Sequence, residues 1–245
     1  MITLSGVHKT FEGTPVLRGV DLHVDRGESM VIIGGSGSGK SVLIKCVLGL
    51  LTPDAGTVTI DGAQMTRRTQ AGFLDRFGML FQGGALFDSL PVWQNVAFRL
   101  LRGPQKADAK EIAIAKLAQV GLTADIADRY PSELSGGMQK RVGLARAIAA
   151  DPEVIFFDEP TTGLDPIMAG VINELIRTVV TDLGVTAITI THDMTSVDVI
   201  ADKVAMLHDG VIRWTGAKSE VATAQDPYLI QFMAGTTDGP ITSRW

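Results

Sequence analysis

The sequence predicts an α/β fold, and three observations point to it. Four nearly unbroken apolar segments have the length and character of strands buried on both faces of a parallel sheet. They are SMVIIG (29–34), FGMLFQ (77–82), EVIFFDE (153–159) and TAITITH (186–192). The elements alternate as in an α/β domain, and no repeat or low-complexity tract interrupts them. Finally, 245 residues with 45% hydrophobic composition provide ample material for a buried core.

Other elements flank these four strands. VLRGVDLHVDRG (16–27) and GTVTIDG (56–62) alternate in hydropathy and predict antiparallel strands. KVAMLHDGVIRWTG (203–216) predicts a hairpin that turns at Asp209-Gly210. In DAKEIAIAKLAQVG (108–121), Asp108 and Glu111 have capping-box spacing and Gly121 is placed to end the helix.

The order of elements predicts one domain over residues 1–245. Helical patterns replace strands over about 83–150, which we interpret as a helical insertion. The C-terminal extension, about 217–245, is expected to hold one or two short helices and a polar tail from residue 235.

Composition narrows the classes of function. The net charge is −5 and the isoelectric point is about 5.4, so no overall positive field favours nucleic acid as a partner. No stretch resembles a signal peptide or a membrane span, so we expect neither. The single cysteine, Cys46, cannot form an internal disulfide, and its apolar neighbours predict a packed thiol.

VIIGGSGSGKS (31–41) contains the phosphate-binding pattern GxxxxGK[ST]. Glycines let backbone N–H groups wrap around phosphates, a lysine reaches the β- and γ-phosphates, and a serine ligates Mg²⁺. The pattern GxGxxG of dinucleotide-binding folds does not fit. The predicted ATP-binding residues are Gly34, Gly35, Ser36, Gly37, Ser38, Gly39, Lys40 and Ser41, with Mg²⁺ on Ser41.

An acidic pair ends the apolar strand in VIFFDEP (154–160). Asp158 is placed to hold Mg²⁺, and Glu159 is placed to orient or deprotonate water, which favours hydrolysis over transfer to another substrate. His192 ends the next strand, where it either contacts the γ-phosphate or is structural. Gln82 ends FGMLFQ, where it either reaches Mg²⁺ and the attacking water or caps the strand.

Two further residues have two interpretations each. Asp165 precedes Pro166 and is explained by helix capping, which does not exclude a second role. Phe11 offers a ring for stacking on a base, or it packs in the core.

A second helix start built to hold an anion occurs in ELSGGMQKRVGLARAIA (133–149). Ser135 can cap the helix, and Gly136 and Gly137 allow another group to approach the backbone. The sequence therefore predicts two phosphate-binding helix starts in one small protein.

Together these motifs resemble the nucleotide-binding subunit of an ABC transporter, up to about Gly216. LSGGMQKR is similar to the family signature LSGGQ, and the order of the motifs also agrees. The resemblance implies a P-loop NTPase (RecA-like) core with an antiparallel β subdomain and a helical signature subdomain. It assigns catalytic roles to Gln82 and His192, with Gln82 also a Mg²⁺ ligand, and a D-loop role to Asp165.

The resemblance also implies a partner. Two copies would form an ATP-sandwich dimer, in which the signature residues Ser135, Gly136, Gly137 and Met138 of one copy face the nucleotide of the other. Met138 departs from the pattern, because it stands where LSGGQ has glutamine and lacks the amide.

A narrower resemblance, to the ATPases of Mla/MCE-type lipid transport systems, lies in FGMLFQGGALFDSLPVWQNVAFRL, DEPTTGLDPI and FMAGTTDGP. It implies phospholipid cargo, a membrane permease, an MCE substrate-binding protein and a place at the cytoplasmic face of the inner membrane. A small regulatory subunit is a further candidate partner. The permease would dock near Leu86, Phe87, Leu90 and Trp93; the alternative is that these residues pack the helical insertion.

Three other functions stay open at this point. The first is an importer ATPase for amino acids or another small solute. The second is an ABC-type protein acting on nucleic acid or ribosomes, which the acidic charge disfavours. The third is a nucleotide sensor without turnover, which the presence of Glu159 and His192 disfavours.

Overall fold

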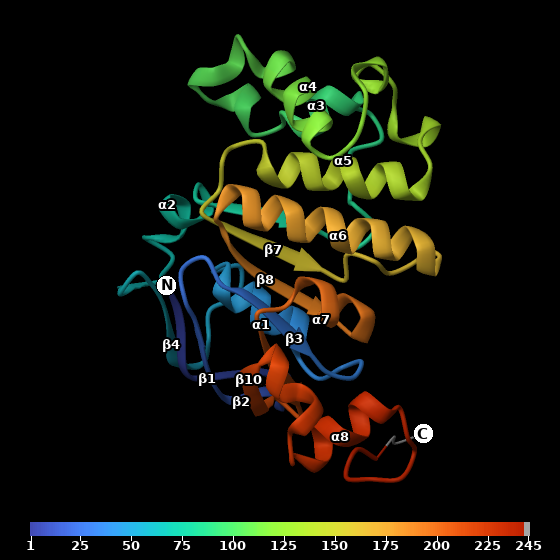
Figure 1. Ribbon diagram of the computed structural model, residues 1–245. Coiled ribbons are helices and arrows are strands. Elements are labelled where there is room, and N and C mark those ends of the chain that lie inside the picture. The colour runs from blue at the N-terminus through green and yellow to red at the C-terminus, as the bar shows by residue number, and fades with distance from the viewer. Residues whose placement is uncertain (243–245) are drawn as a thin grey trace. The chain divides into compact units, whose positions relative to one another are not determined.

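The computed structural model describes residues 1–242 and consists of two compact units (Figure 1). The first unit is formed by Met1–Phe73 and Ile190–Trp245, and the second by Leu74–Thr189. The last three residues of the predicted polar tail lie outside the described residues.

The first unit contains an antiparallel sheet with strand order β2-β1-β4-β5. Its strands are β1 (Ile2–Phe11), β2 (Thr14–Val24), β4 (Ala55–Ile60) and β5 (Ala63–Gln64). Ile2 of the central strand β1 is paired with Val24 on one side and with Ile60 on the other, and all three side chains are buried. The alternating hydropathy of segments 16–27 and 56–62 thus correctly predicts antiparallel strands.

A second set of strands in the first unit has the order β10-β9-β3. They are β3 (Ser29–Ile33), β9 (Lys203–His208) and β10 (Val211–Ala217), with β3 parallel and β10 antiparallel to β9. Every residue of β3 is buried, as its apolar sequence predicts. Asp209 and Gly210 both have positive φ, 52° and 73°, which is the backbone of the predicted two-residue hairpin turn.

The helices of the first unit follow these strands. They are α1 (Lys40–Val47), α2 (Gln70–Leu74, which crosses into the second unit), α7 (Met194–Ile200), a 3₁₀ turn (Lys218–Thr223) and α8 (Pro227–Ala234). The last two are the short helices expected in the C-terminal extension.

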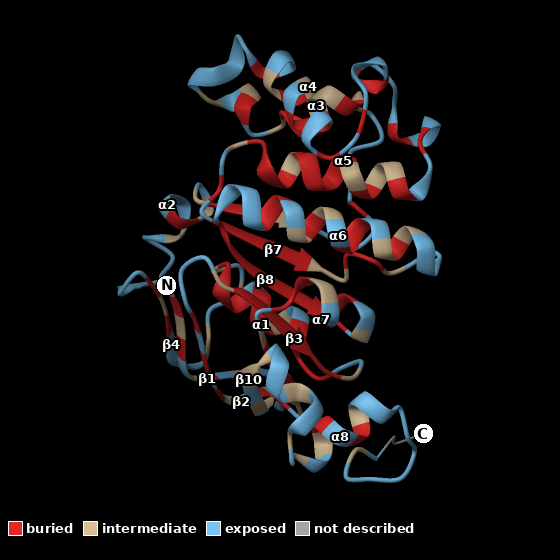
Figure 2. Ribbon diagram, viewed as in Figure 1, coloured by how far each residue is buried: buried red, intermediate tan, exposed pale blue. Residues whose placement is uncertain are grey.

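The second unit contains strands in the order β8-β7-β6. They are β6 (Phe77–Leu80), β7 (Val154–Asp158) and β8 (Thr186–Thr191), whose last two residues belong to the first unit. β6 and β7 run parallel and pair Leu80 with Phe157. Figure 2 shows that β7 and β8 are buried along most of their length, whereas the long helix α6 (Pro166–Leu183) has buried and exposed sides. This unit therefore has the predicted α/β character.

Helices fill the rest of the second unit, as the sequence predicts for residues 83–150. They are α3 (Val92–Val96), α4 (Ala109–Gln119), α5 (Gly136–Ile148) and 3₁₀ turns at Leu100–Arg102, Pro104–Lys106, Ala124–Ile126 and Pro131–Glu133. In residues 1–242 no helix is long and apolar enough to cross a membrane.

One local prediction in this segment is wrong. The Asp108 side chain makes no capping hydrogen bond at the start of α4, so the capping box with Glu111 does not form. The reason is the preceding 3₁₀ turn, which leads directly into α4 and gives Asp108 a φ of −98° and a ψ of 5° instead of an extended backbone. The other end is as predicted, since Gly121 adopts a φ of 70° just after the helix.

Candidate nucleotide-binding site

The loop between β3 and α1 has a backbone that requires glycine. Gly34 has a φ of 157°, and a Cβ there would lie 2.2 Å from the backbone oxygen of Leu207 and 2.9 Å from Ser38 Oγ. Gly39, the N-cap of α1, has a φ of 104°, and its Cβ would lie 3.1 Å from Val16 O. Larger residues at either position would collide with the chain that surrounds the loop. The glycines at these two positions therefore let the loop pack closely against the surrounding chain.

Polar groups inside this loop fit a phosphate. Lys40 is buried, and its Nζ donates hydrogen bonds to Gly34 O at 2.6 Å and Gly35 O at 3.0 Å. Ser38 Oγ is buried and has no hydrogen-bond partner among residues 1–242. Ser41, in the first turn of α1, is exposed. An unsatisfied hydroxyl, a buried ammonium and a helix N-terminus are together suited to bind an anion.

The first unit also holds Phe11 and His192. Phe11 is 41% exposed at the end of β1, and Lys9 Nζ lies 5.6 Å from the centre of its ring. It is thus not a core residue, and the Lys9 ammonium group lies over its ring. His192 directly follows β8 and is exposed.

In the second unit, the parallel pairing of β6 and β7 brings Gln82 to the same sheet edge as the acidic pair. Leu80 pairs with Phe157, and Gln82 and Glu159 each lie two residues beyond these partners. Gln82 is exposed beyond the end of β6, so it does not cap the strand from a buried position.

The backbone at Glu159 is unusual. Its φ is 48°, in the left-handed region that disfavours residues with a Cβ, and Thr162 Oγ1 donates to Glu159 Oε2 at 3.1 Å. Such strain persists where the surrounding structure imposes it and is typical of functional positions. It turns the Glu159 side chain away from the direction that a continuing strand would give it.

Lys140 is a functional candidate that the sequence did not reveal. It is 4% exposed on α5, and its Nζ has no hydrogen-bond partner within the described part of the chain. Burial lowers the pKa of its ammonium group, and the carboxylates of Asp158 and Glu159 act in the opposite direction. The two carboxylates therefore oppose the effect of burial on the Lys140 ammonium group.

The second helix start has the cap that the sequence predicts. Ser135 is the N-cap of α5, with its Oγ accepting from Met138 N at 3.3 Å. Ser135 and Gly136 are exposed, whereas a Cβ on Gly137 would lie 2.6 Å from Met168 Cε. Asp165 caps α6 by accepting from the backbone N–H groups of Ile167 and Met168, both at 3.0 Å.

The departure at Met138 is not compensated by the glutamine that follows it. Gln139 Nε2 donates inward to Pro131 O at 2.9 Å and to Leu134 O at 3.3 Å. It therefore holds the turn before α5, and the exposed end of this helix presents a thioether where the family signature has an amide.

The segment after Gln82 is held by a buried amide. Asn95 is 0% exposed on α3; its Oδ1 accepts from Phe87 N at 2.7 Å, and its Nδ2 donates to Phe87 O at 3.1 Å and Leu90 O at 2.9 Å. Phe87 remains 43% exposed although its ring lies 4.6 Å from that of Phe98. Leu86, Leu90 and Trp93 are half-buried, so these side chains pack partly and also reach the surface.

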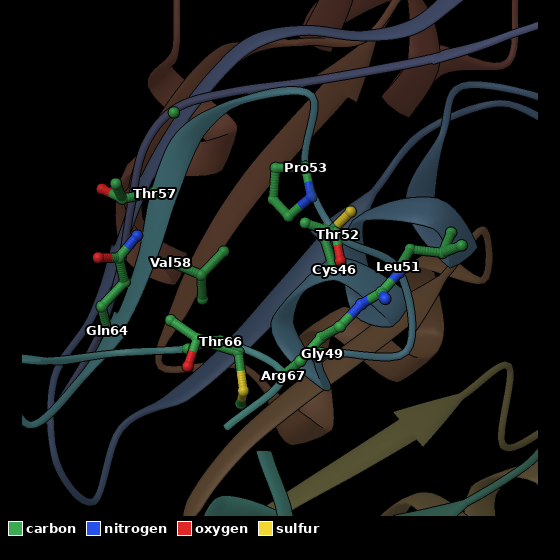
Figure 3. Close-up of a pocket in the computed structure, with 12 residues that line it drawn as sticks. Cys46, Gly49, Leu51, Thr52, Pro53, Thr57, Val58, Gln64, Thr66 and Arg67 are labelled. Atoms are coloured by element: carbon green, nitrogen blue, oxygen red, sulfur yellow. The ribbon is translucent and has the colours of Figure 1, made fainter. Parts of the chain in front are cut away.

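A separate cavity of about 220 Å³ lies beside α1 in the first unit (Figure 3). Thr57, Val58, Gln64 and Thr66 line one side, and Cys46, Leu51 and Thr52 line the other. The Cys46 thiol is free and fully buried, and burial raises its pKa to about 11. It is thus a packed thiol with little nucleophilic character.

A phosphate-binding loop before a helix, together with an acidic pair at the end of an apolar strand, defines a P-loop nucleotide hydrolase. Residues 17–162 match the family model described as ABC transporter. The chain belongs to this family, and it is an ATP-binding, ATP-hydrolysing subunit of a transporter.

Individual relatives agree with the family. The chain is 39% identical to "Intermembrane phospholipid transport system ATP-binding protein MlaF" of Haemophilus influenzae, over 92% of this chain and 87% of that protein. It is 44% identical to "Methionine import ATP-binding protein MetN" of Caulobacter vibrioides, over 90% of this chain and 68% of that protein.

Among solved structures, one similar chain is "Dimeric structure of a post-hydrolysis state of the ATP-binding cassette MJ0796 bound to ADP and Pi". The TM-score is 0.80 at 28% identity, over 89% of this chain and 99% of that one. The predicted P-loop NTPase fold and its resemblance to ABC transporter subunits are therefore confirmed.

Proposed function

We propose that ATP is hydrolysed by the residues that the sequence singles out. The backbone of 34–39 and Lys40 hold the phosphates, and Ser41, Asp158 and Gln82 hold Mg²⁺. When bound, Mg²⁺ neutralises charge on the β- and γ-phosphate oxygens. Glu159 orients the attacking water and accepts its proton, and His192 contacts the γ-phosphate. The support is the backbone of the loop, which requires glycine at Gly34 and Gly39, the Ser38 hydroxyl without a partner in residues 1–242, and the common sheet edge of Gln82 and Glu159.

We further propose that two copies of the chain close around ATP. Ser135 and Gly136 are exposed at the N-terminus of the 13-residue helix α5, and the exposed start of such a helix attracts negative charge. In the dimer, Ser135, Gly136 and Gly137 of one copy contact the γ-phosphate on the P-loop of the other. The dimeric state of MJ0796, which binds ADP and Pi, supports this arrangement.

The transporter subunit would act at the cytoplasmic face of the inner membrane through a permease. The observation that carries this proposal is the segment Leu86–Trp93, which begins four residues after Gln82 and presents the exposed Phe87 ring on a scaffold fixed by Asn95. An apolar side chain held in a fixed position at the surface is suited to receive a short helix of a membrane protein.

For the cargo we propose phospholipid, moved with an MCE-type protein. The support is the 39% identity to MlaF together with the segments FGMLFQGGALFDSLPVWQNVAFRL and FMAGTTDGP. The 44% identity to MetN supports the alternative, an importer for amino acids or another small solute. The lipid transporter and the importer differ in the substrate-binding protein that works with the permease.

Purification of the tagged chain from native membranes tests both alternatives. The lipid-transport proposal expects a permease, an MCE-type protein and bound phospholipid, identified by mass spectrometry. A permease with a soluble amino-acid-binding protein, and no MCE protein, would assign the chain to import. Trp93→Ala provides a check on docking: we expect weaker association with the permease and an unchanged melting temperature of the isolated chain.

A further inference from the structure

The loop that follows Gln82 has an unusual backbone, which its own sequence does not favour at Ala85. Gly83, Gly84 and Ala85 have φ values of 73°, 80° and 44°, so three consecutive residues are left-handed. Glycine adopts this region freely, whereas a Cβ makes it unfavourable at Ala85. Contacts from elsewhere in the second unit must therefore hold this loop, which we call the glutamine loop (82–85).

Helix α5 supplies those contacts through one guanidinium group. Arg146 Nη2 donates to Gly84 O at 2.6 Å, and Arg146 Nη1 donates to Ala85 O at 2.7 Å. Both bonds are short and charge-assisted, and the planar fork matches two neighbouring carbonyls as an ammonium could not. Burial lowers the pKa of the Arg146 guanidinium.

The helix also approaches the loop without any side chain between them. A Cβ on Gly143 would lie 2.7 Å from Leu80 Cδ1 and 3.3 Å from Gly84 Cα and O, and a Cβ on Gly84 would lie 3.1 Å from Gln139 O. Gly143 and Arg146 are three residues apart and so share one face of α5. The close backbone approach fixes Gly84, and the hydrogen bonds from Arg146 fix Gly84 and Ala85.

We propose that Arg146 is a positioning residue for ATP hydrolysis, which holds the glutamine loop in its left-handed form and thereby fixes where Gln82 presents its amide. The inference rests on the proposed role of Gln82 toward Mg²⁺ and water. Arg146 does not touch the nucleotide, and its effect is confined to the geometry of the loop.

Arg146→Lys tests this inference, because lysine retains the charge and loses the fork. In the nucleotide-free full chain, we expect faster amide hydrogen exchange in a peptide covering residues 81–91. In steady-state ATP hydrolysis, we expect kcat to fall and the Mg²⁺ concentration for half-maximal rate to rise, each about tenfold, as for the loss of one charge-assisted hydrogen bond. The KM for ATP should not change, since the P-loop is intact.

Ala85 provides a second test, of which the arm made in the wild-type background does not depend on how well the arginine variant folds. Ala85→Gly removes the conformational penalty, so it should restore part of the rate and of the Mg²⁺ response in the Arg146→Lys background. Ala85→Val in the wild-type background should weaken both, because a β-branched residue disfavours the left-handed region more than alanine. Arg141→Lys is the matched control: Arg141 lies on the same helix and donates to Gly121 O at 3.4 Å, away from this loop.

Two outcomes would overturn the inference. One is that Arg146→Lys leaves both the amide hydrogen exchange of residues 81–91 and the Mg²⁺ concentration for half-maximal rate unchanged. The other is an equal effect of Arg141→Lys, which would indicate general destabilisation of α5. Gln82→Ala separates this inference from the proposed function. If that variant hydrolyses ATP with a normal Mg²⁺ response, Gln82 does not have the proposed role. Amide hydrogen exchange in Arg146→Lys then still decides whether Arg146 holds the loop.

Discussion

Replacing Asn95 by alanine should loosen the proposed docking segment and lower the stability of the chain. The fully buried side chain makes three hydrogen bonds of 2.7 to 3.1 Å to the backbone of Phe87 and Leu90. A typical intramolecular hydrogen bond contributes about 1 kcal/mol net, and leaving buried partners unsatisfied costs more. We therefore expect the free energy of unfolding to fall by about 2–4 kcal/mol, summed from those contributions.

Urea unfolding of the purified chain measures this change, and co-purification measures the association with the permease. Gln94→Ala is the control, because Gln94 is the neighbouring residue on α3 and its side chain makes no hydrogen bond to residues 1–242. If Asn95→Ala and Gln94→Ala lose the same stability, the amide does not hold the segment. If stability falls but permease association stays intact at a temperature where the variant is folded, the segment is not the docking site.

Three further predictions concern the site and the core. Glu159→Gln should slow ATP hydrolysis by at least about 100-fold while ATP still binds, because an amide cannot accept the proton of water. Turnover and nucleotide binding are measured in parallel, and normal turnover would show that Glu159 is not catalytic. In a tethered heterodimer, Ser135→Arg in one copy should disable hydrolysis at the P-loop of the other copy. Inactivating each P-loop in turn shows which of the two sites still hydrolyses ATP. Loss of hydrolysis at the mutant copy's own P-loop would contradict the trans arrangement. The Cys46 pKa is raised from 9.0 to about 11 in the folded chain, so the folded state retains a proton that the unfolded state loses. The free energy of unfolding should therefore fall between pH 9 and pH 11 relative to Cys46→Ala, and an identical pH profile for both proteins would refute the shift.

The sequence predicts those parts of the site that depend on local backbone. The P-loop is specified by glycines at fixed spacing before a helix, and the structure explains Gly34 by a backbone oxygen 2.2 Å from where its Cβ would lie. The hairpin at Asp209-Gly210 and the cap at Asp165 are likewise short-range features. In each case the residues that form the motif stand within a few positions of one another, although the oxygen that excludes a Cβ at Gly34 belongs to the distant Leu207.

Contacts between distant segments could not be predicted in this way. Gln139 turns inward to the Pro131 and Leu134 carbonyls, and Lys140 is buried, but both residues occur in a run of polar residues that is typical of a solvated helix face. The bond from Arg146 to Gly84 spans 62 positions in the sequence. The capping box at Asp108 fails for a related reason, because the preceding 3₁₀ turn determines the backbone there.

The second unit concentrates these long-range contacts on α5. Its first residues follow Ser135, and its Gly143 and Arg146 contact the glutamine loop. A helix of 13 residues is a stiff element, so a displacement at its N-terminus is shared with the residues that contact the loop. Closure of a partner's nucleotide on Ser135 would then act on Gln82 through the same helix. The dimer arrangement we propose therefore gives α5 two effects: it completes the phosphate site of the partner and adjusts the position of Gln82 in its own chain.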